Sequence, residues 1–204
     1  PRIRGAERML ARRPRRLLAG ALAGTIAVGA AAALAATPAP QSATDAKGDV
    51  RSTLDLTRVS VARSADGRLR ASITLAGAWD ASALKDDNGP PGSICLKAWT
   101  TSVAPDTTPD YLVCVTADAQ GDLRGSVLHE RANKLPERTA GADVSRPSAR
   151  TVTLRFSQTA LGRPATLSVG AETTRAGCPR VSCIDTAPDA PKTLTLKLRE
   201  TPAK

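Results

Sequence analysis

Aromatic residues and histidine are scarce in this 204-residue chain. The aromatic side chains are Trp79, Trp99, Tyr111 and Phe156, and His129 is the single histidine. One histidine excludes the H-E-x-x-H zinc site, which needs two. The sequence also contains no G-x-S-x-G motif, so a hydrolase-type serine–histidine triad has no signature. We therefore expect a protein that is not an enzyme. A pair of carboxylates for glycoside hydrolysis stays an alternative, because the two residues would come together only in the folded structure and need not be close in the sequence.

Charge is absent from one long stretch, residues 17–36, which follows the arginine pairs 12–13 and 15–16. This stretch ends in the small-residue site Ala33-Leu34-Ala35. A basic segment, an apolar segment and an A-x-A site in that order are typical of a secretory signal peptide. We predict that residues 1–35 are cleaved and that the protein is secreted, with no membrane attachment afterwards. A retained anchor and a twin-arginine export signal are the alternatives.

The high net charge comes mainly from this leader. The chain has 29 basic and 19 acidic residues, a net charge of +10. Residues 1–35 hold seven arginines and one glutamate, so the remainder has 22 basic and 18 acidic residues, a net charge of +4. The remainder has no basic run with interleaved aromatics. We therefore expect no nucleic-acid partner.

Four cysteines follow the leader: Cys95, Cys114, Cys178 and Cys183. An even number in an exported chain indicates two disulfides, with three possible connectivities. We favour Cys95–Cys114, on two strand-like segments, and Cys178–Cys183, which closes a short loop. Zinc is the alternative, but the sequence has no C-x-x-C pair.

Strand patterns dominate residues 45–200, which we predict to be one domain after a flexible Pro/Ala/Ser spacer at 36–44. Residues 69–75, 151–156 and 194–199 alternate apolar and polar side chains, and Asp66-Gly67 is a hairpin turn signal. Residues 131–147 show no clear period and predict an extended excursion across the surface. No alternation of strands with helices is found, so we do not expect a parallel sheet. We expect an all-β fold, an antiparallel sandwich of about eight to nine strands stapled by two disulfides.

The segment 45–55 is the best ligand candidate. It carries Asp45, Asp49 and Asp55 around a Gly turn, and closely spaced carboxylates suit Ca²⁺. The spacing matches no EF-hand, and Asp and Gly are also ordinary turn residues. The order of these residues before a Val-rich strand resembles the opening of DOMON-like and family 9 carbohydrate-binding-module-like sandwiches. That resemblance implies a β-sandwich with a calcium-bearing loop at these three aspartates. The Ala, Arg, Thr and Asp bias is similar to that of exported actinobacterial proteins.

Two further features suggest binding roles. Trp79 and Trp99 would form a sugar-stacking platform if exposed, whereas the simpler interpretation is that both fill the core. Arg180 lies in the loop closed by Cys178 and Cys183. A rigid, exposed loop that presents a basic residue is suited to binding a protein partner or to inhibiting a serine protease. The alternative is a turn that the disulfide merely stabilises, with no binding role.

We expect an exported, non-catalytic binding module for cell-wall or other extracellular polysaccharide, with structural calcium. The alternatives are a domain that binds an extracellular protein, or inhibits a serine protease, through Arg180, and a structural protein of the cell envelope.

Overall fold

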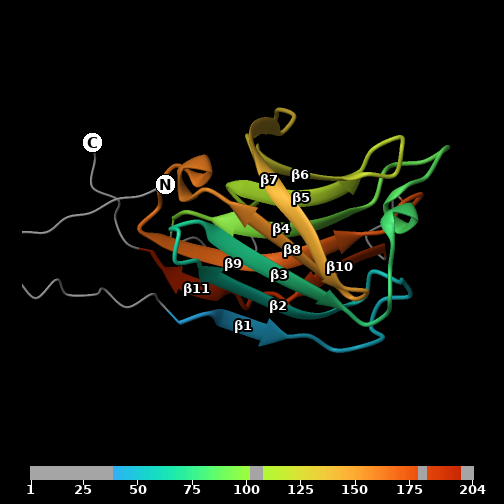
Figure 1. Cartoon of the computed structure of the whole chain (residues 1–204), viewed down its shortest axis with the longest axis horizontal. Helices are drawn as coiled ribbons and strands as arrows, with labels where there is room; N and C mark the ends of the chain where they lie inside the picture. The colour runs from blue at the N-terminus through green and yellow to red at the C-terminus, as the bar shows by residue number, and fades with distance from the viewer. Residues whose placement is uncertain (1–38, 102–107, 179–182, 199–204) are drawn as a thin grey trace, which may run out of the picture. The chain divides into compact units, whose positions relative to one another are not determined.

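A computed structural model describes residues 39–101, 108–178 and 183–198. This part is all-β, with two short 3-10 helices at Ala81–Leu84 and Gln158–Leu161 (Figure 1). The described strands are β1 (Gln41–Thr44), β2 (Leu56–Arg63), β3 (Leu69–Leu75), β4 (Ser93–Trp99), β5 (Tyr111–Ala117), β6 (Leu123–His129), β7 (Glu137–Ser148), β8 (Thr151–Phe156), β9 (Thr166–Thr174), β10 (Ile184–Ala187) and β11 (Leu194–Lys197). The predicted signal peptide at 1–35 lies outside the described residues.

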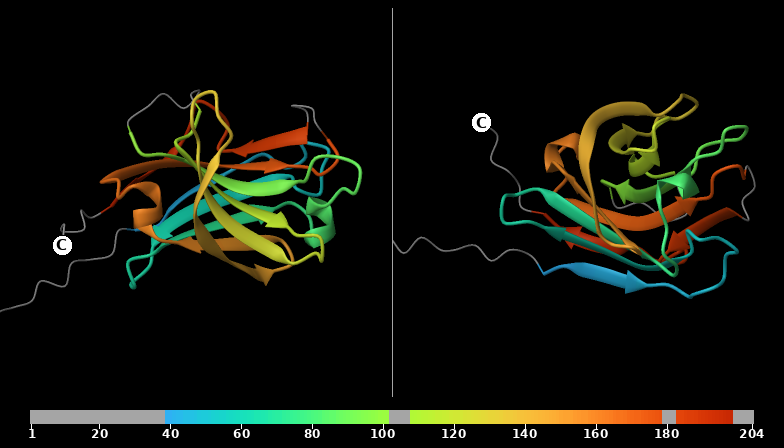
Figure 2. Two further views of the ribbon diagram at one scale, coloured as in Figure 1. Left: turned by 90° about the horizontal axis from the view of Figure 1, so that it is seen from above. Right: turned by 45° about the vertical axis from the view of Figure 1, so that its right-hand side comes forward.

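The strands form one antiparallel sheet that is nearly closed into a barrel. Their order is β1-β2-β3-β8-β7-β6-β5-β4-β9-β10, and β11 also pairs with β9. The long β7 joins the two halves, since its first part pairs with β6 and its second part with β8. Figure 2 shows β7 curving from one half to the other. The sheet therefore folds back on itself, with β1 at one free edge and β10 and β11 at the other.

The all-β, antiparallel prediction is confirmed, but the sandwich of eight to nine strands is not. The described part has eleven strands in a continuous, barrel-like sheet. The main difference is β7, which lies in the segment where we expected an extended excursion. None of its side chains is fully buried. Those that pack half-buried against the core are Ala140, Ala142 and Val144, so the alternation is short and weak in the sequence. Continuous pairing through β7 is what turns two layers into one sheet.

The short strand β1 corrects the predicted spacer at 36–44. Gln41–Thr44 pairs in register with β2 from Val61 to Arg58. Four residues are too few to show a period of two, and the neighbouring prolines suggest a linker. The chain therefore joins the sheet before Asp45, which fixes where the acidic segment begins.

The predicted strand alternation at 69–75 is confirmed by burial. Leu69, Ala71, Ile73 and Leu75 are at most 1% exposed and face the core. The side chains between them face outward, because successive residues of a strand point to opposite faces. The turn before this strand is the predicted one: Gly67 adopts a φ of +80°, a conformation that favours glycine.

Both predicted disulfides are present. Cys95 and Cys114 face each other across β4 and β5, in register. Cys178 and Cys183 close the loop between β9 and β10. Disulfides persist in oxidising compartments, so the pair of bonds indicates an extracytoplasmic environment. None of the described helices has the length and apolar character of a membrane span.

Candidate metal centre at the free edges of the sheet

The connection between β1 and β2 carries three aspartates. Asp45 directly follows β1, and its N–H donates to the carbonyl of Thr57 at 3.0 Å. The chain then turns through Gly48, whose φ of +88° is a left-handed conformation that favours glycine. The Gly48 N–H donates to Asp55 Oδ2 at 2.9 Å. Asp55 thus ties the turn to the start of β2.

The opposite free edge supplies a fourth carboxylate, Asp185. It is the second residue of β10 and is only 6% exposed. Its Oδ2 accepts the N–H of Leu56 at 2.5 Å, and its Oδ1 accepts the N–H of Thr186 at 2.8 Å. Asp185 is therefore held by one N–H at the start of β2 and by the N–H of the next residue in its own strand.

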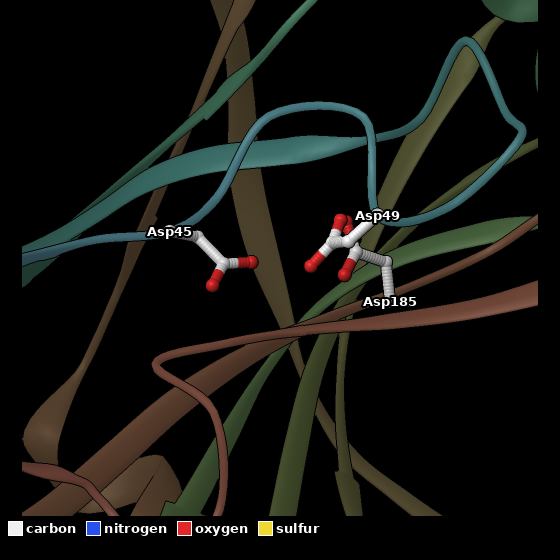
Figure 3. A group of neighbouring side chains, drawn as sticks. All are labelled: Asp45, Asp49 and Asp185. Atoms are coloured by element: carbon white, nitrogen blue, oxygen red, sulfur yellow. The ribbon is translucent and has the colours of Figure 1, made fainter.

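These aspartates form a cluster. Carboxylate oxygens of Asp45, Asp49 and Asp185 all lie within 4.8 Å of one another. Figure 3 shows the carboxyl group of Asp45 directed toward those of Asp49 and Asp185. No described basic side chain forms a salt bridge with these three residues or with Asp55. The site consequently gathers negative charge that forms no salt bridge within the described part of the chain.

Two carboxylate oxygens of this region lack a hydrogen-bond donor. Asp55 is 5% exposed, and its Oδ1 is buried without a partner. Asp45 Oδ2 is also buried without a partner. A buried carboxylate is costly unless it is paired, protonated or bound to a metal. Both atoms therefore need a proton or a cation.

The electrostatics of the cluster favour protonation when no cation is bound. Burial raises the pKa of Asp45 to about 6, and repulsion by Asp185 and Asp189 adds to the effect. Burial also raises the pKa of Asp55, with a contribution from the charge of Asp49. The pKa of Asp185 is raised by burial first, and then by Asp49 and Asp55. A cation would relieve the same repulsion.

The donor set suits calcium better than zinc. Ca²⁺ takes six to eight oxygen ligands in flexible geometry, and four carboxylates can supply several. Zinc sites are built mainly from cysteine and histidine. All four cysteines are in disulfides, and His129 stacks on Tyr111 with ring centroids 4.7 Å apart. The cluster can therefore bind a hard, oxygen-preferring cation.

The structure brings together two of the three predicted ligands, Asp45 and Asp49, and places Asp55 beside them through Gly48. Sequence reasoning missed Asp185, which lies 129 residues beyond Leu56, its hydrogen-bond partner. The only available signal was a charged residue at an inward position of a short strand, since Asp185 and Ala187 share the buried face.

Both tryptophans fill the interior. Trp79 is 5% exposed and Trp99 is 3% exposed, and Arg146 lies over the Trp79 ring at 4.5 Å. Neither ring offers a flat face to a sugar, so the exposed platform that we considered does not form. The ring of Trp79 instead belongs to the main hydrophobic cluster.

Arg180 lies outside the described residues, so the structure does not place it. The base of its loop is described: Gly177 N–H donates to the carbonyl of Pro90 at 2.9 Å. Gly177 adopts a φ of +71°, a conformation that favours glycine, and a Cβ there would displace the Asp86 side chain, whose Oδ2 would lie 1.8 Å away.

A second polar feature lies at the end of the β5–β6 hairpin. A hollow of about 310 Å³ is lined by Thr108, Pro109, Asp110, Glu130, Arg131, Ala132 and Asn133. Asp110 is fixed there, because its Oδ2 accepts from the N–H and the hydroxyl of Thr100 at 2.7 and 2.8 Å. Arg131 forms an ion pair with Glu137 at 2.9 Å. The hollow thus presents several hydrogen-bonding side chains in one place.

Comparison with known proteins gives no relative: no protein-family model, curated protein or solved structure matches this chain. The functional argument therefore depends on the geometry of the chain itself.

Proposed function

We propose that this protein is an exported, non-catalytic binding module that binds an extracellular polysaccharide and carries a structural calcium ion. The ion is held by Asp45, Asp49 and Asp55, the predicted set, together with Asp185. The two disulfides support action in an oxidising compartment outside the cytoplasm.

The polar hollow at the β5–β6 end is the observation that carries the binding role. Its volume, about 310 Å³, is near the lower end of the range for ligand pockets. Asp110, Glu130, Arg131 and Asn133 offer carboxylate, guanidinium and amide groups to the hydroxyls of a sugar. A site without a stacking aromatic ring depends on such hydrogen bonds. It fits one or two residues of a polymer rather than a deep substrate cleft.

The test is retention of the oxidised, exported protein on insoluble polysaccharides and on isolated cell walls, with calcium and with chelator. We expect retention on one matrix, and Glu130→Ala should weaken binding by at least about tenfold, as loss of a hydrogen bond to a charged group costs about 1.5–3 kcal/mol. Asp122→Asn is the matched control, because Asp122 lies in the exposed turn at the other end of the same hairpin.

Absence of retention on every matrix would contradict the polysaccharide ligand. Inhibition of a trypsin-like protease, lost in Arg180→Ala, would then favour the protein-binding alternative. Equal retention of Glu130→Ala and the unchanged protein would place the sugar site elsewhere on the surface.

A further inference from the structure

The two free edges of the sheet meet without a backbone ladder in the described part. β1 ends one side and β10 and β11 end the other. Two hydrogen bonds link the sides instead, each through a side chain: Leu56 N–H to Asp185 Oδ2 at 2.5 Å, and Thr173 Oγ1 to the Leu54 carbonyl at 2.7 Å. This boundary, which we call the seam, is therefore held by side-chain hydrogen bonds rather than by a backbone ladder in the described part.

The carboxylates of the cluster come from both sides of the seam. Asp45, Asp49 and Asp55 belong to the β1–β2 connection, whereas Asp185 belongs to β10. Like charges within 4.8 Å of one another push the two edges apart when all are ionised. A cation among them would pull the same edges together.

A second observation points to a ligand at this place. Asp55 is 5% exposed, and its carboxyl group is turned into the connecting loop, where Oδ2 accepts from Gly48. Its Oδ1 is buried with no donor. This atom has no reason to stay unpaired in a barrel wall unless an ion or proton completes its coordination.

We infer that a calcium ion bound across the seam, with Asp185 of β10 as a ligand, closes the barrel. This inference rests on the calcium ion of the proposed function and assigns it a role. Extracellular modules commonly bind calcium with dissociation constants of about 10⁻⁴–10⁻³ M. The seam then closes where calcium is plentiful, after export, and opens when calcium is removed.

Hydrogen exchange on the oxidised, exported protein tests the closure. If calcium binds only the closed seam, the opening equilibrium falls by the factor 1 + [Ca²⁺]/Kd, so exchange slows about tenfold at ten times Kd. We expect this slowing in peptides covering 41–56 and 183–187. Exchange in the β4–β5 hairpin, which the Cys95–Cys114 bond crosses, should change little.

Two variants sharpen the test. Asp49→Asn removes an exposed member of the cluster and should abolish the calcium-dependent protection of both segments. Asp87→Asn, in the exposed loop after Leu84, should preserve it. Asp185→Asn should act like Asp49→Asn. If Asp185→Asn fails to fold, the comparison of the unchanged protein with Asp49→Asn still tests the calcium-dependent protection.

The outcomes separate this inference from the proposed function. Calcium binding measured by calorimetry, with unchanged exchange at 41–56 and 183–187, would overturn the closure and leave the calcium site standing. Absence of calcium binding would overturn the closure and the calcium site, and would leave the polysaccharide site to its own test. Slower exchange in the two segments together with calorimetric binding would support the closure and the calcium site.

Discussion

Asp55 shows at the scale of one residue why the cluster needs a partner. One of its oxygens is satisfied by Gly48, and the other is buried without a donor. Neutral groups of this kind cost a few kcal/mol when unpaired, and charged groups cost more. A proton or a cation must therefore share the site, and the two can be told apart by pH and by metal.

The first prediction concerns pH in the metal-free protein. Asp45 has a pKa of about 6 in the fold and 3.8 as its ordinary value, so the folded state binds more protons between these values. The free energy of unfolding should therefore fall as pH rises through about 6. Urea unfolding at pH 5 and pH 7.5, after removal of metal, measures the difference.

Asp45→Asn provides the control, because it removes one titrating group and should reduce this slope. Asp55 and Asp185, whose pKa values burial also raises, keep the rest of it. Asp66, Asp80 and Asp118 act in the opposite sense, because hydrogen bonds lower their pKa values. Their contributions to stability are lost only at lower pH. A rise in stability from pH 5 to 7.5 in the metal-free protein would contradict the arrangement of the cluster.

At the scale of the strands, the turn of the sheet at β6 and β7 depends on a close approach. A Cβ on Gly125 would lie 2.2 Å from the backbone oxygen of Ala142, its partner in β7. A real Cβ cannot come so near, so the strands would have to separate. Gly141, one residue along the same ladder, has no atom nearer than 3.9 Å to its Cβ position.

The second prediction follows from this pair. Gly125→Ala should lower the free energy of unfolding by about 1–3 kcal/mol, the usual cost of overpacking. Gly141→Ala should change it by less than about 0.5 kcal/mol. Thermal or urea unfolding of both variants measures the difference, and equal stability of the two would show that β6 and β7 do not approach as described.

The third prediction concerns the disulfides. Cys95–Cys114 closes a loop with a sequence separation of 19, and Cys178–Cys183 one of 5. Loop entropy predicts losses of about 3 and about 2 kcal/mol when each pair is replaced by alanine. Chemical unfolding of the two double variants measures which disulfide contributes more to the free energy of unfolding. A larger loss for Cys178–Cys183 would contradict the entropic explanation.

The sequence predicts the strands with clear alternation and both disulfide pairs, because those signals are local. Leu69 to Leu75 show a period of two, and Cys95 and Cys114 lie in adjacent apolar segments. β7 and β1 are not predicted, because the inward face of β7 carries only the half-buried Ala140, Ala142 and Val144, and β1 has only four residues. Asp185 escapes because its partners lie at the other end of the chain, and only the folded sheet brings them together.

At the scale of the whole barrel, one ion acts on the stability of the entire fold. A ligand that binds only the native state adds about 1.4 kcal/mol at ten times its dissociation constant. For a domain of this size that corresponds to a rise in Tm of about 3–6 °C. The fourth prediction is that calcium raises Tm by this amount, measured by thermal unfolding with and without chelator.

Magnesium is the informative comparison in that experiment. It requires near-ideal octahedral geometry and gives up its water reluctantly, so a cluster of carboxylates on two strand edges suits it less well. We expect a smaller rise in Tm with magnesium at the same concentration. An equal rise would indicate general screening of negative charge rather than a specific site.

Isothermal titration of calcium into the metal-free, oxidised protein is the most direct measurement of the calcium site. We expect one ion per chain with a dissociation constant of about 10⁻⁴–10⁻³ M, weakened at least about tenfold by Asp49→Asn and unchanged by Asp87→Asn. Absence of saturable binding, or equal binding by both variants, would contradict a calcium site at Asp45, Asp49, Asp55 and Asp185.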